Sequence, residues 1–224
     1  METELKLRFS REDGPQLLND DPWLRDLLMP GSNTVKRMKS VYYDTAGSDL
    51  QTIRTSLRLR QEEDEYVITI KRDDGFEEEA DGLHQRMEWS AVVNEDNEFE
   101  LDFEKGFDTT AFLRFATSSG DPEESLREVL DLIEGQPLIK VCSAEFTRQS
   151  SYLGFGDTLM EISIDAGQLT GGSSKEDFAE VEVELQEGDA RDLFALGEEL
   201  MARFPLEPEP RSKYGRCLAL KDNG

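Results

Sequence analysis

Alternation of charged and apolar residues at every second position is the feature that most restricts how this chain can fold. It occurs over residues 57–60, 162–165 and 180–184, among other segments. Because successive side chains of a β-strand point to opposite faces, each segment has one charged face and one apolar face when it forms a strand. The pattern therefore predicts a mainly β protein.

Eight segments have this strand character, and several others have helical spacing. We expect strands at about residues 2–9, 36–44, 53–61, 65–72, 83–92, 138–152, 158–166 and 178–186. Helices are expected over 14–28, 121–134 and 188–204, because their apolar residues recur at spacings of three and four, and 211–221 should form a final short element. No linker separates two parts, so we expect a single domain over residues 1–224.

The charges on these strands are segregated by sign. Arg and Lys lie in the strands over 53–61, 65–72 and 83–92, whereas carboxylates lie on the last two strands and on the first. A sandwich with a wet exterior explains any one strand but not this segregation. We therefore expect an α+β, mainly β fold: an eight-stranded closed barrel, whose charged face lines a tunnel and whose apolar face packs beneath helices on the outside.

Charges that face one another across a narrow tunnel need partners. Two carboxylates about 7 Å apart repel by roughly 2 kcal/mol at an effective dielectric constant of about 20. Carboxylate oxygens without His or Cys suit hard cations such as Mg²⁺ or Mn²⁺. A ring of Arg and Lys suits a highly charged oxyanion such as a polyphosphate.

Composition excludes several other classes of function. The 50 acidic and 25 basic residues give a net charge of -25, which disfavours nucleic acid or an anionic membrane as a partner. Cys142 and Cys217 form no CxxC pair, and His84 is the single histidine, so a thiolate zinc site and a Ser-His-Asp triad are not expected. With no signal peptide and no long apolar segment, we expect a soluble cytoplasmic protein; monomer and dimer both remain open.

The first strand contains the ExExK pattern, with Glu2, Glu4 and Lys6 on one face. Further motifs follow in order: Tyr42-Tyr43-Asp44-Thr45, Leu57-Arg58-Leu59-Arg60, Thr69-Ile70-Lys71, Leu83-His84-Gln85-Arg86-Met87-Glu88, Ile162-Ser163-Ile164-Asp165, Glu180-Val181-Glu182-Val183-Glu184-Leu185 and Ser212-Lys213. Together these motifs resemble the CYTH domain, the triphosphate tunnel metalloenzyme family, over nearly the whole chain. Within the family the chain looks most similar to bacterial inorganic triphosphatases, which commonly carry a CHAD domain that is not expected here.

The resemblance implies an antiparallel eight-stranded tunnel in which a divalent metal, Mg²⁺ or Mn²⁺, assists hydrolysis of the terminal phosphate of a small-molecule triphosphate. The metal ligands that it implies are Glu2, Glu4, Asp165, Glu182 and Glu184. The implied phosphate-binding residues are Lys6, Arg58, Arg60, Lys71, Arg86, Arg148 and Lys213. The implied catalytic residues are Glu180, Glu182, Glu184 and Lys213, with one of the carboxylates positioning the attacking water.

Some assignments stay open. Glu88 is expected to orient Arg86 or to support the metal, Lys140 depends on whether a bulge separates it from Arg148, and Asp44 is expected to be structural. The same tunnel in relatives cyclises ATP or hydrolyses thiamine triphosphate, so adenylate cyclase and thiamine or nucleoside triphosphatase remain alternatives. A polyphosphate-binding module without catalysis is an alternative of another class.

Overall fold

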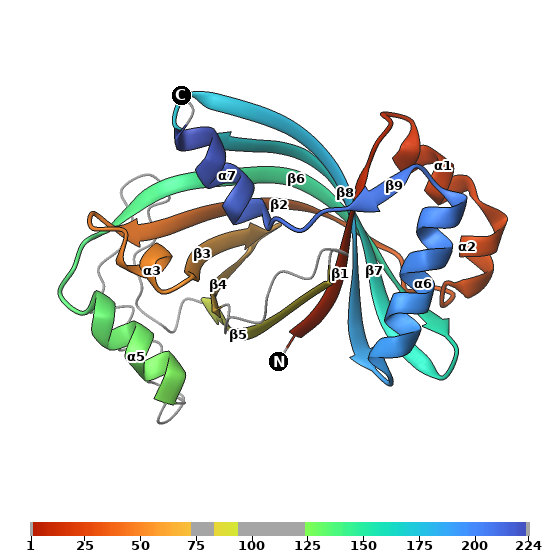
Figure 1. Ribbon diagram of the computed structural model, residues 1–224, viewed down its shortest axis with the longest axis horizontal. Coiled ribbons are helices and arrows are strands. Elements are labelled where there is room, and N and C mark those ends of the chain that lie inside the picture. The colour runs from red at the N-terminus through yellow and green to blue at the C-terminus, as the bar shows by residue number, and fades with distance from the viewer. Residues whose placement is uncertain (1, 73–82, 94–123, 223–224) are drawn as a thin grey trace.

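The computed structural model describes residues 2–72, 83–93 and 124–222. Its strands are β1 (Glu2–Phe9), β2 (Thr34–Thr45), β3 (Thr55–Glu62), β4 (Glu65–Arg72), β5 (Leu83–Val93), β6 (Leu138–Phe155), β7 (Thr158–Gly171), β8 (Ser174–Glu187) and β9 (Leu206–Pro208). Its helices are α1 (Gly14–Asp20), α2 (Pro22–Leu27), α3 (Asp49–Thr52), α5 (Glu124–Ile133), α6 (Ala190–Arg203) and α7 (Lys213–Asp222). Figure 1 shows the long curved strands in the middle, with helices at both ends.

All strands belong to one antiparallel sheet in the order β5-β4-β3-β2-β6-β7-β8-β1-β9. One edge of β1 pairs with β8, and its other edge is shared, because residues 2–5 pair with β5 and residues 7–9 pair with β9. The expected eight-stranded closed barrel is therefore wrong, because the described sheet has nine strands and is not closed. The end strand β5 pairs over four residue pairs, Leu83–Arg86 with Glu2–Leu5, with β1, which is next to the other end strand, β9.

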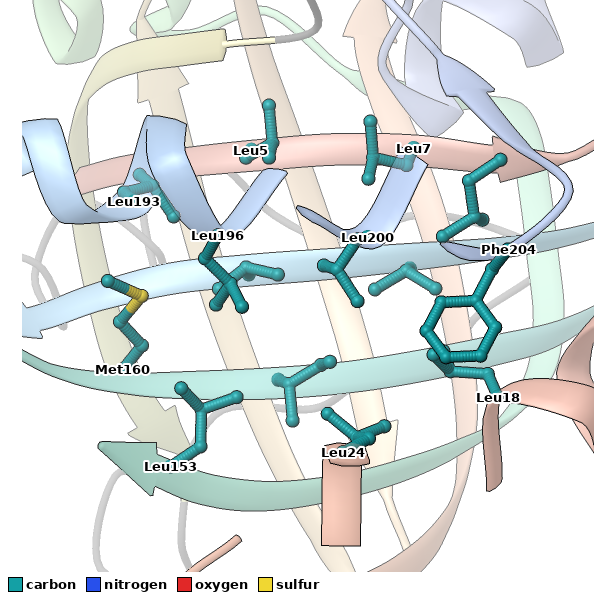
Figure 2. Packing of buried hydrophobic residues seen from close by; sticks show 14 residues of the cluster. Leu5, Leu7, Leu18, Leu24, Leu153, Met160, Leu193, Leu196, Leu200 and Phe204 are labelled. Atoms are coloured by element: carbon teal, nitrogen blue, oxygen red, sulfur yellow. The ribbon is translucent and has the colours of Figure 1, made fainter. Parts of the chain in front are cut away.

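The two faces of the sheet are as different as the alternation predicts. Leu5 and Leu7 of β1 are buried on the outer face beneath α6, where Leu193, Leu196 and Leu200 cover them (Figure 2). Glu4 and Lys6, from the same strand, are also buried, but on the inner face. Both faces of β1 are therefore inside the protein, one against apolar side chains and the other against charges.

A second apolar cluster covers the outer face at the other end of the sheet. Leu57 and Leu59 of β3 and Ile68 and Ile70 of β4 pack there with helices α3 and α5. The helix α3 was not expected. The carboxylate of Asp44 accepts hydrogen bonds from the backbone N–H groups of residues 45, 50 and 51 and so holds this helix, which confirms that Asp44 is structural.

Helix α7 differs from the other helices because it lies against the inner face. Tyr214, Cys217 and Leu220 of α7 pack on inner-face residues of β2, β6, β7 and β8, among them Tyr42 and Phe146. The expectation that the helices pack on the outside is wrong for this one. Its position brings Lys213, at the first turn of α7, into the charged interior.

Two further expectations need correction. The single helix expected over 14–28 is two helices, because Asp21 is extended and caps α2 by accepting hydrogen bonds from the N–H groups of Trp23 (2.8 Å) and Leu24 (3.4 Å). The Pro-rich segment expected to be a break contains β9.

Within the described residues, none of the helices has the length and apolar character that a membrane-spanning helix requires.

Candidate active site

Strand register brings distant carboxylates together on the inner face. Glu4 of β1 lies opposite Glu184 of β8, which in turn lies opposite Glu161 of β7. In the next row Lys6 lies opposite Glu182. Alternation places the charged residues of each strand on the inner face. Because neighbouring strands are only about 5 Å apart, these residues form one charged patch across β1, β8 and β7.

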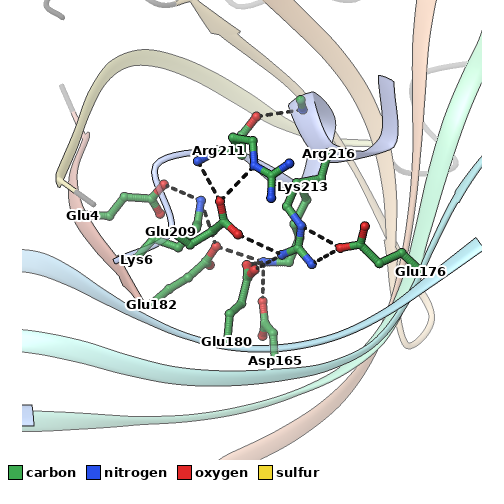
Figure 3. A network of polar contacts seen from close by, with 12 residues as sticks. Glu4, Lys6, Asp165, Glu176, Glu180, Glu182, Glu209, Arg211, Lys213 and Arg216 are labelled. Atoms are coloured by element: carbon green, nitrogen blue, oxygen red, sulfur yellow. Dashed lines mark hydrogen bonds and ion pairs between the residues drawn. The ribbon is translucent and has the colours of Figure 1, made fainter. Parts of the chain in front are cut away.

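Lys213 lies at the centre of this patch (Figure 3). Its Nζ is 2.5 Å from Glu180 Oε1, 2.7 Å from Asp165 Oδ2 and 2.9 Å from Glu182 Oε1. Carboxylate oxygens of these three acids lie within 4.8 Å of one another. The ammonium group of Lys213 thus takes the position that a cation would take among three carboxylates.

Arg148 of β6 binds two of the same carboxylates, those of Asp165 and Glu182. Its Nε and Nη2 donate to the two oxygens of Asp165 at 2.8 and 2.7 Å, and Nη2 also donates to Glu182. Burial alone raises a carboxyl pKa, but Arg148 and Lys213 outweigh it and lower the pKa of Asp165. Lys213, Lys6 and Arg148 likewise hold the pKa of Glu182 well below its usual range against the effect of burial.

Lys6 and Glu4 extend the network toward β1. Lys6 Nζ lies 3.3 Å from both Glu4 Oε1 and Glu182 Oε1. Burial works against its charge, yet Glu4 and Glu182 outweigh burial and raise the pKa of Lys6. Lys6 is therefore charged and fixed between two carboxylates at neutral pH.

Arg216 is a member of the network that sequence reasoning missed. It is buried on α7, and its Nη1 donates to Glu180 Oε2 at 2.9 Å while its Nη2 lies 2.5 Å from Glu176 Oε1. The signal was present in the sequence, because Arg216 follows Lys213 by three residues and so shares its helix face. Both oxygens of Glu180 are engaged as a result, and burial raises its pKa despite Lys213.

A cavity of about 90 Å³ adjoins this network, and we call it the cationic cavity. Its lining contains six of the seven expected phosphate-binding residues; the side chain of the seventh, Arg86, lies outside the described part of the chain. The lining residues are Glu4, Lys6, Tyr42, Ser56, Arg58, Arg60, Lys71, Glu88, Arg148, Glu182, Ser212, Lys213 and Tyr214. Six cationic side chains thus face three carboxylates.

Two residues that line this cavity each have a buried polar atom without a partner. Among the residues that the structure describes, Arg58 Nε and Tyr214 Oη are the buried side-chain polar atoms without a hydrogen bond. Burial and the nearby cations Arg58 and Arg148 lower the pKa of Arg60 to about 10. Unsatisfied donors and mutually repelling cations in one cavity favour an anionic ligand.

Lys71 and Glu88 form the far wall of the cationic cavity. Lys71 Nζ is 2.8 Å from Glu88 Oε2, and the hydroxyl of Ser90 donates to Glu88 Oε1 at 2.6 Å. Burial opposes the charge of Glu88, but Lys71 outweighs it and lowers the pKa of Glu88 to about 2. The described partners of Glu88 are therefore Lys71 and Ser90, whereas the expected contact with Arg86 falls on a side chain outside the described residues.

The strand register gives the positions of Glu2 and Lys140 in the sheet. Glu2 pairs with Arg86 in the β1–β5 ladder, although the side chains of both lie outside the described residues. The β2–β6 register shifts between Tyr42 and Tyr43, and Lys140 is opposite Tyr43 of the outer face. A bulge therefore separates Lys140 from the inner face that Arg148 occupies.

The donor set fits a hard divalent cation chemically. Asp165, Glu180 and Glu182 offer only oxygen ligands, which Mg²⁺ and Mn²⁺ prefer. Lys213, Arg148 and Arg216 already pair with these three, whereas Glu184 forms no ion pair with any described residue. Burial and the neighbouring Glu4 raise the pKa of Glu184. Glu184 thus has less compensating positive charge than Asp165, Glu180 or Glu182, whereas its neighbour Glu4 pairs with Lys6.

The chain is similar in sequence to a curated protein, the inorganic triphosphatase of Haemophilus influenzae, with 29% identity over 202 residues. The alignment covers 89% of this chain and 49% of the relative. The chain thus spans about half the length of this curated relative.

Solved structures share the fold. A proposed adenylyl cyclase of Hippeastrum, described as having a dominant triphosphatase activity, superposes with a TM-score of 0.68 at 19% identity, covering 98% of this chain and 96% of that one. A proposed adenylate cyclase of Bacillus halodurans gives a TM-score of 0.56 at 16% identity, covering 96% of each chain. The CYTH domain family matches residues 1–216, which confirms the resemblance read from the motifs. The chain therefore belongs to the CYTH domain family.

Proposed function

We propose that this protein hydrolyses the terminal phosphoanhydride bond of a triphosphate, with inorganic tripolyphosphate as its substrate and the cationic cavity as its binding site. The observation that carries the proposal is the pair of unpartnered buried atoms, Arg58 Nε and Tyr214 Oη, in a cavity with six cationic side chains. Membership of the CYTH family and the similarity to an inorganic triphosphatase support the same substrate.

The cationic side chains have separate tasks in this proposal. Arg58 and Arg60 offer planar guanidinium groups that can bind two phosphate oxygens at once, and Lys71 supplies a point charge from the opposite wall. Lys6, Arg148 and Lys213 lie where the cavity meets the carboxylates, and Arg86 would add a further cation from β5. Together they neutralise charge on the phosphate chain as the bond breaks.

Glu2, Glu4, Asp165, Glu182 and Glu184 would hold Mg²⁺ or Mn²⁺. When bound, such a cation neutralises phosphate charge and polarises the phosphorus–oxygen bond that is attacked.

Glu184 is best placed to accept a proton from the attacking water. Glu180 has both oxygens bound by Lys213 and Arg216, and Glu182 is bound by three cations. Glu184 lies in the adjacent row, opposite Glu4; it is hydrogen-bonded with Gln186 and forms no ion pair with a described residue. Its carboxylate is therefore available to orient water for in-line displacement.

The test is to replace Glu4 or Glu184 with Gln, which keeps the volume of the side chain but removes its charge. Phosphate release should be abolished at saturating tripolyphosphate and Mg²⁺ in both variants. The unfolding midpoint should change little in Glu184→Gln, whereas Glu4→Gln also loses the charge that pairs with buried Lys6 and should be less stable. Wild-type activity in either variant would contradict the assignment.

A substrate panel separates the alternative functions. Tripolyphosphate, ATP and thiamine triphosphate are compared for phosphate release in Mg²⁺ and in Mn²⁺, together with an assay for cyclic AMP. Cyclic AMP formation would favour the cyclase activity proposed for two structural relatives. Tight binding of tripolyphosphate without phosphate release would favour a non-catalytic polyphosphate-binding module.

A further inference from the structure

Two cysteines from distant parts of the chain meet where helix α7 packs on the inner face. Cys142 lies on β6 and Cys217 on α7, and both are buried, free thiols. The thiol of Cys142 is hydrogen-bonded with Cys217, and Cys217 Sγ donates to the backbone oxygen of Ser143 at 3.4 Å. The two thiols are therefore in contact, one on the sheet and one on the helix.

A glycine lets the two backbones approach closely at this point. Gly171 of β7 is the cross-strand partner of Cys142. A Cβ atom placed on Gly171 would lie 2.2 Å from the backbone oxygen of Cys217, so a side chain at this position would push α7 away. Opposite residues of an antiparallel pair have Cα atoms about 4.5–5.5 Å apart. The backbone of α7 thus passes close to Cys142, as a disulfide between Cα atoms about 4.4–6.8 Å apart requires.

Burial keeps this pair unreactive while α7 is docked. The side chains are 2% and 0% exposed, so a small oxidant does not reach them. The hydrogen bond with Cys217 and burial together raise the pKa of the Cys142 thiol, whereas the thiolate is the form that attacks a disulfide. Oxidation therefore begins when α7 leaves the inner face and is completed as the helix returns.

Cys217 lies one helical turn from the cationic cavity. Ser212, Lys213 and Tyr214 line that cavity, and Cys217 follows Lys213 by four residues, about 6 Å along the helix axis. The cavity has a volume of about 90 Å³, well below the range of roughly 300–1,000 Å³ typical of small-molecule sites. Its other lining residues belong to strands, which ladder hydrogen bonds hold in the sheet. The start of α7 is thus the part of the wall that can move to admit a triphosphate.

We propose that Cys142 and Cys217 form a reversible disulfide that fixes α7 on the inner face and excludes substrate from the cationic cavity. Disulfides of proteins in reducing compartments are usually transient and regulatory, which fits a pair that is reduced at rest. The exclusion of substrate rests on the proposed function, whereas formation of the disulfide does not.

The oxidant in this proposal is a low-molecular-weight disulfide. With α7 away from the sheet, the Cys217 thiolate attacks one sulfur of the oxidant, which forms a mixed disulfide and releases the first small thiol. As α7 returns, the Cys142 thiolate attacks the sulfur of Cys217 and releases the second small thiol. The two cysteines together lose two electrons and two protons, and the small disulfide takes them up as two thiols.

The experiment incubates the full chain with oxidised glutathione, and Cys142→Ala and Cys217→Ala are matched controls that each keep a single thiol. Intact mass after alkylation under denaturing conditions distinguishes the intramolecular disulfide from glutathione adducts and from free thiols. In the wild type the disulfide should form, and it should raise Tm by roughly 4–16 °C. The Tm of the single variants should not rise, because they can form only adducts.

The effect on the site is measured with tripolyphosphate. Because apparent affinity falls with the fraction of the protein in the competent state, kcat/KM and the affinity measured by calorimetry should fall about tenfold or more in the disulfide form. Dithiothreitol should restore both values in the same sample, so the comparison does not depend on the folding of a variant.

The outcomes separate this inference from the function on which it rests. Free thiols or glutathione adducts alone in the oxidised wild type would overturn the disulfide. A disulfide form with undiminished kcat/KM and affinity, or a loss of activity that follows the adduct instead, would overturn the exclusion of substrate. Absence of phosphate release from the reduced wild type would refute the proposed function, whereas mass, Tm and calorimetry would still test the disulfide and its effect on binding.

Discussion

Replacing Lys213 with Met tests the central electrostatic argument. Methionine has a similar length but no charge, so the substitution removes the ammonium group that contacts Asp165, Glu180 and Glu182 at 2.5–2.9 Å. The side chain of Lys213 is 5% exposed, and those of Asp165 and Glu180 are fully buried. Water cannot replace the lost charge without rearrangement.

The expected loss of stability follows from this burial. Breaking a buried ion pair by removing one partner costs about 3–5 kcal/mol, because the other charges stay buried and uncompensated. Arg148, Lys6 and Arg216 remain near the three carboxylates, which keeps the loss within that range. For a chain of this length the corresponding fall in Tm is roughly 6–20 °C.

The assay is urea unfolding followed by circular dichroism at pH 7, with Lys175→Met as the control, because Lys175 is an exposed lysine of β8. The pKa of Glu180 is already raised by burial, so stability linked to its protonation is present at low pH and disappears as the pH rises. The deficit of Lys213→Met should therefore shrink as the pH is lowered from 7 toward 5. Millimolar Mg²⁺ or Mn²⁺ should also reduce it, since a divalent cation can bind the three vacated carboxylates.

Two results would refute this reasoning. A change in the free energy of unfolding below about 1 kcal/mol at pH 7 would mean that Lys213 does not compensate buried charge. A deficit that grows as the pH falls would mean that the carboxylates do not respond to protonation as their burial requires.

Three further predictions concern single contacts. Tyr214→Phe removes a hydroxyl that has no partner in the cationic cavity, so the free protein should be as stable as the wild type or more stable by up to about 1–3 kcal/mol, while the thermal shift produced by tripolyphosphate should shrink. Asp21→Ala removes the cap of α2 and should lower the free energy of unfolding by about 1 kcal/mol in urea titrations. Gly197→Ala places a methyl group 2.3 Å from Leu5 Cδ2, where α6 crosses β1, and should destabilise by about 1–3 kcal/mol in the same assay. Unchanged unfolding in the last two variants, or an unchanged tripolyphosphate shift in the first, would contradict the corresponding contact.

Much of the candidate site could be predicted from local patterns. Alternation places Glu4 and Lys6 on one face of β1 and Leu5 and Leu7 on the other, and the structure has the charges inside and the leucines under α6. The same rule places Arg58 and four other expected cations of the strands, Lys6, Arg60, Lys71 and Arg148, on the face that lines one cavity. The separation of α1 from α2 at Asp21 could also be predicted, because the residue before a proline avoids helical geometry.

Other features depend on the whole chain. Sequence indicated Lys213 as a functional residue, but only the packing of α7 on the inner face shows that it binds three carboxylates and brings in Arg216. The bulge beside Tyr42, which turns Lys140 to the outer face, likewise follows from the pairing of β2 with β6.

Local pattern in the sequence was therefore enough to identify the inward-facing residues of the regular strands, since the two-residue period of a strand is a local property of the backbone. Which cation neutralises which carboxylate was decided only by tertiary structure. Those partners lie up to 176 positions apart in the chain for the pair of Lys6 and Glu182, and strand register and helix docking bring them within 3.3 Å.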